Sequence, residues 1–149
     1  MNEGLTVSFQ SGEADGRLAG LVLETLKIST ARERRRWKEL NVVLAGDELL
    51  QRLNRDYLGF DEVTDVLSFD LGDDPGGAIE GEIYVSTDRA RVQADERGVT
   101  FEFELLHLVV HGLLHLCGYD HEDDASLLQM NDRGEQYVRS VLEREIVGG

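Results

Sequence analysis

Hydrophobic and polar positions alternate in two ways along this chain, and the two patterns predict short strands and longer helices. The strand-like pattern occurs at Leu5–Phe9, Val42–Ala45, Val66–Phe69 and Glu82–Val85. Helical patterns and capping signals predict helices over Arg17–Lys27, Asp47–Tyr57, Thr87–Arg97, Phe101–Cys117 and from the acids at 122–124 to about Glu145. Asp47 is the expected N-cap of the second helix. This order of elements predicts an α+β fold in a single domain, residues 1–149, with one mixed β-sheet packed against helices.

The segment Phe101–Cys117 differs from the other predicted helices because most of its positions are Leu, Val or Phe. Such a pattern is typical of a helix that is buried on nearly all sides. Thr100 is placed to cap its N-terminus, and Glu102 and Glu104 fall in the first turn, where the helix dipole favours acids. Gly118 is expected to end the helix, because glycine adopts the left-handed conformation at little cost.

Three of the four histidines of the chain lie at the end of this helix and in the turn behind it, in the sequence HGLLHLCGYDH. At about 3.6 residues per turn, His111 and His115 lie one above the other on one helix face, spaced to hold a single ion. After Gly118 the chain turns, so that His121 is able to return as a third ligand. Three protein ligands leave a fourth tetrahedral position open, as at a catalytic zinc. We therefore expect these three histidines to bind one Zn²⁺. Hydrogen-bonded core histidines are the alternative, and three imidazoles also suit nickel and copper.

The spacing HxxxHxxGxxH is that of the metzincin peptidases, which carry Glu directly after the first histidine. In those enzymes the Glu takes a proton from the attacking water, and in this chain the position is Gly112. Glycine cannot act as a base. The metal site is retained, whereas a zinc peptidase becomes the least favoured function.

Two further residues near the histidines are expected to stay outside the ligand set. His107 lies one turn before His111, and a fourth protein ligand would close the site, so we interpret His107 as a buried neighbour or a support for a ligand. Cys117 lies two residues after His115, which rotates it roughly 200° around the helix. As the only cysteine of the chain, it is interpreted as a small buried apolar residue.

Length and composition are consistent with one cytoplasmic enzyme domain. A chain of 149 residues is long enough to bury a substantial core. The N-terminal MNEGLTVSFQ has neither a basic start nor an apolar stretch, so we expect no secretory signal. No apolar run approaches the roughly 20 residues that cross a bilayer, and a single cysteine fits a reducing compartment.

The charge balance opposes non-specific binding to nucleic acid, because 30 acids against 15 Lys and Arg give a formal net charge of −15. The segment Arg32–Lys38, RERRRWK, departs from this balance with five cations and a Trp in seven residues. One interpretation is a surface for nucleic-acid phosphates, with Trp37 stacked on a base. The favoured interpretation is a solvated helix end whose Trp anchors in the core.

The histidine segment resembles the signature of the YbeY family, bacterial rRNA maturation factors described as metal-dependent, single-strand-specific endoribonucleases. A second segment, LNRDYLGFDEVTDVLSF at Leu53–Phe69, is similar to the other motif of that family in Leu53-Asn54, Asp61 and the run from Thr64. A third, GEIYVS at Gly81–Ser86, resembles its Gly-acid-Ile strand. The motifs follow the order of the family, over roughly residues 40 to 125.

This resemblance implies a zincin-like fold with one zinc ion per chain, held by His111, His115 and His121. It also implies cytoplasmic work on ribosomal RNA of the small subunit, in 16S rRNA 3′-end processing and ribosome quality control.

Two positions depart from the family pattern. Many members have an Arg where this chain has Leu58, and that Arg is thought to help bind or cleave RNA. Arg52 and Arg55 are the substitutes that the sequence offers. The usual proline before Thr-Asp is Val63, which is expected to change the loop rather than the chemistry.

The sequence assigns no catalytic base. Asp65, Glu82 and Asp120 are candidates, but each has a structural interpretation, as a turn former, a strand-edge acid and a hydrogen-bond partner of a ligating histidine. The candidates for a substrate groove are Asn54, Thr64, Asp65 and Ser68, although capping and turn roles explain these residues about as well.

Three functions are compatible with this site. A zinc endoribonuclease of rRNA maturation predicts an open coordination position beside an electropositive groove, since zinc polarises a phosphoryl oxygen and lowers the pKa of bound water to about 7. A ribosome-assembly binding factor with a structural metal predicts a metal without exchangeable water, or activity only with a partner protein. A zinc peptidase requires an acid that reaches such a water. We favour the endoribonuclease.

Overall fold

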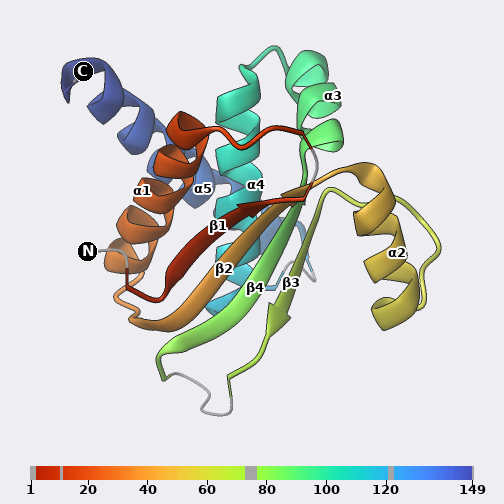
Figure 1. Ribbon diagram of the computed structural model, residues 1–149. Coiled ribbons are helices and arrows are strands. Elements are labelled where there is room, and N and C mark those ends of the chain that lie inside the picture. Colours follow the sequence, from red (N-terminus) through yellow and green to blue (C-terminus); the bar gives the residue numbers. More distant parts are fainter. Residues whose placement is uncertain (1–2, 11, 73–76, 121–122, 149) are drawn as a thin grey trace.

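A computed structural model of the chain describes residues 3–10, 12–72, 77–120 and 123–148. Within these ranges one sheet contains β1 (Leu5–Phe9), β2 (Trp37–Ala45), β3 (Val66–Asp70) and β4 (Ile79–Ser86). The strand order is β1-β2-β4-β3 (Figure 1). β1, β2 and β4 run parallel, and β3 pairs antiparallel with β4 at the edge. This mixed sheet confirms the predicted α+β fold.

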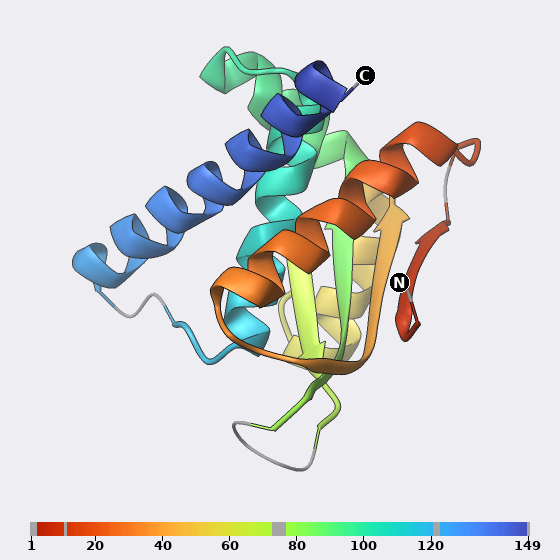
Figure 2. The same cartoon turned by 90° about the vertical axis from the view of Figure 1, so that its left-hand side faces the viewer.

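Five helices are present in the described ranges: α1 (Gly16–Arg32), α2 (Asp47–Leu58), α3 (Thr87–Arg97), α4 (Phe101–Leu116) and α5 (Asp124–Gly148). Helices α1, α4 and α5 share the main hydrophobic core with β1, β2 and β4. Helix α2 stands apart and covers a small second cluster on the opposite face (Figures 1 and 2). Within the part of the chain that the structure describes, no single helix has the length and apolar character needed to cross a membrane.

Most predicted elements are confirmed, with differences at their ends. Helix α1 continues to Arg32 rather than Lys27. Strand β2 begins at Trp37 rather than Val42, because it pairs in parallel with β4 from Ile79 onward. This pairing joins distant segments, so the local apolar pattern did not reveal it.

The prediction that Asp47 caps α2 is wrong. Gly46 is the N-cap and Asp47 is the first helical residue. The Asp47 carboxylate accepts a 2.7 Å hydrogen bond from Oγ of Ser86, and its backbone N–H donates to Oδ2 of Asp88 at 2.9 Å. Tertiary contacts to the start of α3 replace the local cap.

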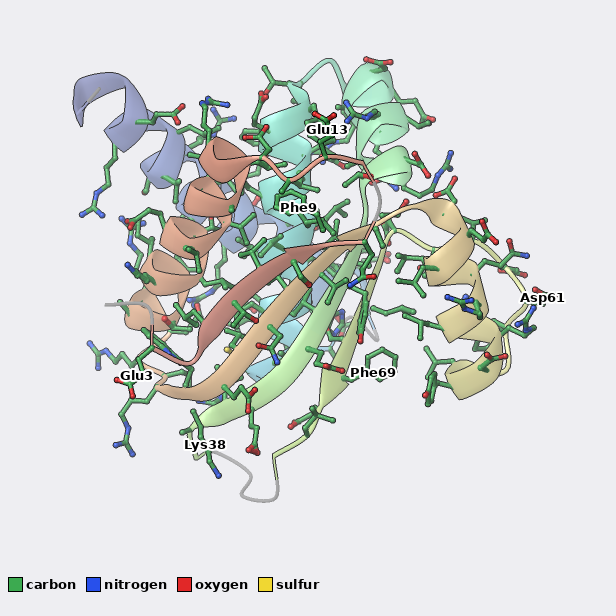
Figure 3. The ribbon with its side chains drawn as sticks, in the orientation of Figure 1. Glu3, Phe9, Glu13, Lys38, Asp61 and Phe69 are labelled. Atoms are coloured by element: carbon green, nitrogen blue, oxygen red, sulfur yellow. The ribbon has the colours of Figure 1, made fainter. Side chains whose placement is uncertain are left out.

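Alternate residues of β3 and β4 face opposite sides of the sheet. Ser68 and Ile83 face α4, where their atoms lie closest to Gly112. Phe69 and Tyr84 face the side of α2, with ring centroids 5.7 Å apart and the rings edge to face. Phe69 is labelled on this side in Figure 3. Only residues of the first set are therefore able to reach a site on α4.

Two glycines allow α4 to lie close to the sheet. A Cβ at Gly112 would lie 2.6 Å from Cγ2 of Ile83 and 2.9 Å from Oγ of Ser68. A Cβ at Gly81 would lie 2.9 Å from Cδ1 of Leu116, on α4, and 2.8 Å from the carbonyl oxygen of Phe69. Since real Cβ contacts are longer, both glycines are required for this packing, which fixes the depth at which α4 presents its histidines.

Candidate metal centre

Two histidines break an otherwise buried helix. From Phe103 to Leu116, every residue of α4 is buried except His111 and His115. Thr100 caps the helix through a 3.1 Å hydrogen bond from the N–H of Phe103 to its Oγ1, as predicted. Within Phe103–Leu116, solvent therefore reaches α4 only along the face that carries the two imidazoles.

The two imidazoles converge. Nε2 of His111 lies 3.1 Å from Nε2 of His115, and the ring centroids are 4.8 Å apart. Two nitrogens bound to one tetrahedral zinc at ordinary bond lengths would lie about 3.3 Å apart, so the observed spacing fits a shared ion.

The second ring nitrogen of His115 is engaged by the backbone. Nδ1 of His115 donates to the carbonyl oxygen of Tyr119 at 3.1 Å. Because a carbonyl oxygen only accepts, Nδ1 carries the proton, and the neutral ring then has its lone pair on Nε2. Metal-binding histidines are oriented in the same way, with one nitrogen on a carbonyl or carboxylate and the other on the metal.

The chain turns sharply after α4, as predicted. Gly118 has φ 98°, in the left-handed region, and its N–H donates to the carbonyl of His115 at 3.0 Å. The N–H of Tyr119 donates to the carbonyl of Leu114 at 3.0 Å. Among the described residues no three His, Cys, Asp or Glu side chains gather to hold an ion, and His121, the third residue of the predicted set, lies outside them.

Cys117 is not a suitable thiolate ligand for a metal ion. Its side chain packs against the main core, and burial raises the pKa of the thiol to about 11. A thiol with this pKa stays protonated at neutral pH, as expected for a small apolar residue.

A hollow of about 370 Å³ begins beside His111. Its walls come from α3, α4, α5 and the residue before β3. The polar residues that line it include Asp65, Gln93, Arg97, Glu104, His107 and Glu135. No local pattern predicts this grouping, because the residues come from separate elements.

The hollow is acidic on balance. Arg97 hydrogen bonds to Glu104 through Nη1, and its Nη2 lies 3.7 Å from Oε1 of Glu135. Burial raises the pKa of Glu104, and the charge of Arg97 opposes the shift. With Asp65 there are three acids to one arginine in the described lining, so this hollow is not the electropositive groove that was predicted.

His107 lies in the wall of this hollow and is buried, as expected for a neighbour of the ligands. Its Nε2 lies 3.4 Å from the carbonyl oxygen of Asn131, and its ring stacks on Phe103 with centroids 6.3 Å apart. Burial lowers the pKa of His107, so its ring is neutral at neutral pH.

The structure separates the three candidate bases. Asp65 lines the hollow with His111 and accepts a 3.1 Å hydrogen bond from Nε2 of Gln93. Glu82 lies on the opposite face of the sheet, where it accepts from the hydroxyl of Tyr84 at 3.3 Å. Asp120 is exposed in the turn after α4. Of the three, Asp65 is the one that lines the hollow described above, beside His111.

Two of the four substrate-groove candidates have structural hydrogen bonds. The Ser68 hydroxyl donates to the carbonyl of Gly112 at 2.8 Å. The buried Asn54 donates from Nδ2 to the carbonyl of Glu62 at 3.1 Å, which holds the loop after α2. Thr64 is half-buried in that loop. Asp65 is the member of this set that lines the hollow, and a substrate role for any of the four stays a prediction.

The Arg-rich segment forms the turn between α1 and β2. Helix α1 ends at Arg32, Arg34 has φ 57°, and β2 begins at Trp37. The Trp37 ring packs against the main core, as the favoured interpretation expects, and its N–H donates to the carbonyl of Glu3 at 2.8 Å (Glu3 is labelled in Figure 3). The segment after Arg32 is a turn rather than a helix end.

A larger hollow, of about 730 Å³, lies at the carboxyl ends of the parallel strands. Its described lining contains no histidine and several acids, among them Glu13, Asp15, Asp47, Glu48 and Asp88. The chemistry predicted from the histidines therefore belongs to the smaller hollow.

With this geometry established, comparison with known proteins identifies the family. The sequence profile of the family described as Endoribonuclease YbeY matches residues 7–142. The chain belongs to the YbeY endoribonuclease family. The match extends beyond the roughly 85 residues over which the motifs show the resemblance, and it confirms that resemblance.

Individual members of the YbeY family are also similar to this chain in sequence. An endoribonuclease YbeY from Salinibacter ruber is 44% identical over 110 residues, which are 69% of this chain and 70% of that protein. An endoribonuclease YbeY from Desulfitobacterium hafniense is 39% identical over 142 residues, 89% of this chain and 88% of that protein. A solution structure of a Thermotoga maritima protein superposes with a TM-score of 0.67 at 34% identity, covering 97% of this chain and 93% of that one.

The position where the resemblance implies an Arg is a surface position in this chain. Leu58 is the last residue of α2 and is 52% exposed. Tyr57, Phe60 and Val63 beside it are also exposed. An apolar surface thus occupies the place where the family pattern has a cation.

Proposed function

We propose that this chain is a zinc-dependent endoribonuclease that cuts single-stranded RNA in the maturation of ribosomal RNA. The observation that carries this proposal is the pair of imidazoles whose Nε2 atoms converge at 3.1 Å on the accessible strip of α4, beside the hollow. Family membership supplies the reaction class, and the paired histidines support the proposed dependence on a metal.

The described residues fit a zinc ion in donor type as well as spacing. His111 and His115 would hold it, with His121 as the proposed third ligand. His115 is held as the neutral tautomer with its lone pair toward His111, which is the form that binds metal. When bound, zinc supplies Lewis acidity to a phosphoryl oxygen on which charge develops during cleavage.

The residues of the chain divide the remaining tasks. We propose that Asp65 accepts a proton from the water that attacks the phosphate, because this carboxylate shares the hollow with His111 and Gln93 holds it in place. The acids of the hollow would repel a phosphate but accept hydrogen bonds from base amino groups and ribose hydroxyls. We therefore place a nucleoside in the hollow and the phosphate at the metal.

The alternatives are less well supported. A zinc peptidase needs an acid at position 112, but a Cβ at Gly112 would already overlap Ile83 and Ser68, and that side chain would point into the sheet. A binding factor with a purely structural metal does not account for a hollow that opens beside one ligand. From the family resemblance we also propose that the protein acts in the cytoplasm on the small ribosomal subunit.

Cleavage of a single-stranded RNA by the zinc-loaded wild type and by His115→Ala tests the proposed function. We expect cleavage by the wild type, its loss on metal removal and recovery with added zinc, and no cleavage by the variant. A duplex of the same sequence should be cut much more slowly. Equal cleavage by both proteins would show that the metal takes no part in the reaction. No cleavage by the zinc-loaded wild type would refute the proposed endoribonuclease activity.

A further inference from the structure

The Arg-rich turn contains a buried acid that joins α5 to the turn after α4. Glu33 is the C-cap residue of α1, and its side chain is 7% exposed. Its carboxylate accepts hydrogen bonds from the Tyr119 hydroxyl at 2.8 Å, from Nη1 of Arg133 at 3.0 Å and from the Tyr137 hydroxyl. A buried carboxylate that accepts three donors is a well-defined anchor, since each bond to a charged acceptor is strong.

Tyr119 connects this anchor to the proposed metal site. Its hydroxyl donates to Glu33, while its backbone carbonyl accepts the hydrogen bond from Nδ1 of His115. The guanidinium of Arg133 lies 5.8 Å from the centre of the Tyr119 ring and restrains it further.

Arg35, which lies in the same Arg-rich turn as Glu33, also hydrogen bonds to the segment that follows α4. Its Nη1 donates to the carbonyl of Cys117 at 3.3 Å, and its Nη2 donates to the carbonyl of Gly77 at 3.0 Å. Glu33 and Arg35 therefore contact both ends of the three-residue segment that follows α4, Cys117–Tyr119. This segment supplies the carbonyl that holds His115.

We infer that Glu33 and Arg35 are positioning residues for the metal centre. By fixing the Cys117–Tyr119 segment they hold the Tyr119 carbonyl where it selects the tautomer and orientation of His115. This inference rests on the proposed function for the identity of the metal, and it assigns to the Arg-rich turn a role in metal affinity. Outer partners of this kind change metal affinity by about 10- to 100-fold when they are lost.

Tyr119→Phe is the sharpest test, because it removes only the hydroxyl and leaves the backbone carbonyl. Tyr137→Phe is the matched control, since it removes a hydroxyl from the same carboxylate without touching the loop. Zinc affinity is measured for each protein by competition with a chromophoric chelator, and the stability of the metal-free protein by thermal unfolding. We expect zinc to bind about 10-fold more weakly to Tyr119→Phe and within about 2-fold of wild type to Tyr137→Phe.

Further variants separate positioning from a general loss of structure. Glu33→Gln should weaken zinc binding to a similar extent. In the double variant Glu33→Gln/Tyr119→Phe, the change in the logarithm of the zinc dissociation constant should be smaller than the sum of the two single changes. Zinc affinity of Tyr119→Phe within 2-fold of wild type, or equal losses in both tyrosine variants, would overturn the inference. The assay contains no RNA, so a wild type that binds zinc but cuts no RNA would refute the proposed function and leave this inference standing.

Discussion

The hydroxyl of Ser68 on β3 donates a 2.8 Å hydrogen bond to the backbone carbonyl of Gly112 on α4. This contact is possible because Gly112 has no side chain, and Ser68 and Ile83 occupy the space where its Cβ would lie. The residue directly after the first histidine therefore seats the helix on the sheet. In peptidases with the same histidine spacing, the corresponding residue is the Glu that takes a proton from the attacking water.

Gly112→Ala is expected to destabilise the protein by about 1–3 kcal/mol, because the added methyl group would lie 2.6 Å from Cγ2 of Ile83. Chemical unfolding of the metal-free protein measures the change. Gly20→Ala is the control, since Gly20 is also helical but has nothing within 4 Å of its added Cβ. This change should stabilise by about 0.5–1 kcal/mol. Equal effects at both positions would show that α4 is not packed as described.

Asp65→Asn is expected to lower kcat for RNA cleavage by about 100-fold or more, because an amide cannot accept the proton, while zinc affinity stays near that of wild type. Glu82→Gln is the matched control, since Glu82 lies on the opposite face of the sheet and contacts Tyr84. Single-turnover cleavage with saturating zinc gives both rates. Should Glu82→Gln reduce cleavage as much as Asp65→Asn, the assignment of the proton acceptor would be wrong.

Leu58→Arg is expected to strengthen binding of single-stranded RNA, because it restores a cation where the family pattern has one. One added phosphate contact would steepen the dependence of log K on log salt concentration by about 0.7. Stability should change by no more than about 0.5 kcal/mol, since Leu58 is 52% exposed. Leu128→Arg adds the same charge at another exposed position, on α5, and is the control. Equal salt dependence in the two variants would argue against a specific contact at position 58.

His107 is expected to make stability depend on pH. Burial lowers its pKa in the folded protein, so below the ordinary histidine pKa of about 6.5 the unfolded chain takes up a proton that the folded one resists. The contribution of His107 is therefore present above pH 6.5 or so and is lost as the pH falls. Unfolding free energies of metal-free wild type and His107→Gln, compared at pH 8 and pH 5.5, should differ less at the lower pH. A difference that does not change with pH would contradict the buried neutral ring.

The paired histidines were predictable because their geometry is local. His111 and His115 lie on one continuous helix, whose period sets their spacing before any tertiary contact forms. Thr100 and Gly118 mark its ends by equally local rules. The α+β class followed from the order of the elements in the same way.

The surroundings of the histidines were not predictable, because they are made by tertiary contacts. Glu33 and Tyr119 are 86 positions apart in sequence, and no spacing rule joins them. Asp65 and Arg97 reach the hollow from different elements. Asp47 failed as a cap for the same reason, since Ser86 offers its carboxylate a partner from another strand.

Metal content is the most direct test of a zinc ion shared by His111 and His115. Wild type, His115→Ala and His107→Gln are loaded with zinc, dialysed against metal-free buffer and measured by mass spectrometry, with folding checked by circular dichroism. Wild type and His107→Gln should retain about one zinc per chain, and His115→Ala should retain less than about a tenth of that. Retention of a full equivalent by folded His115→Ala would contradict the shared site.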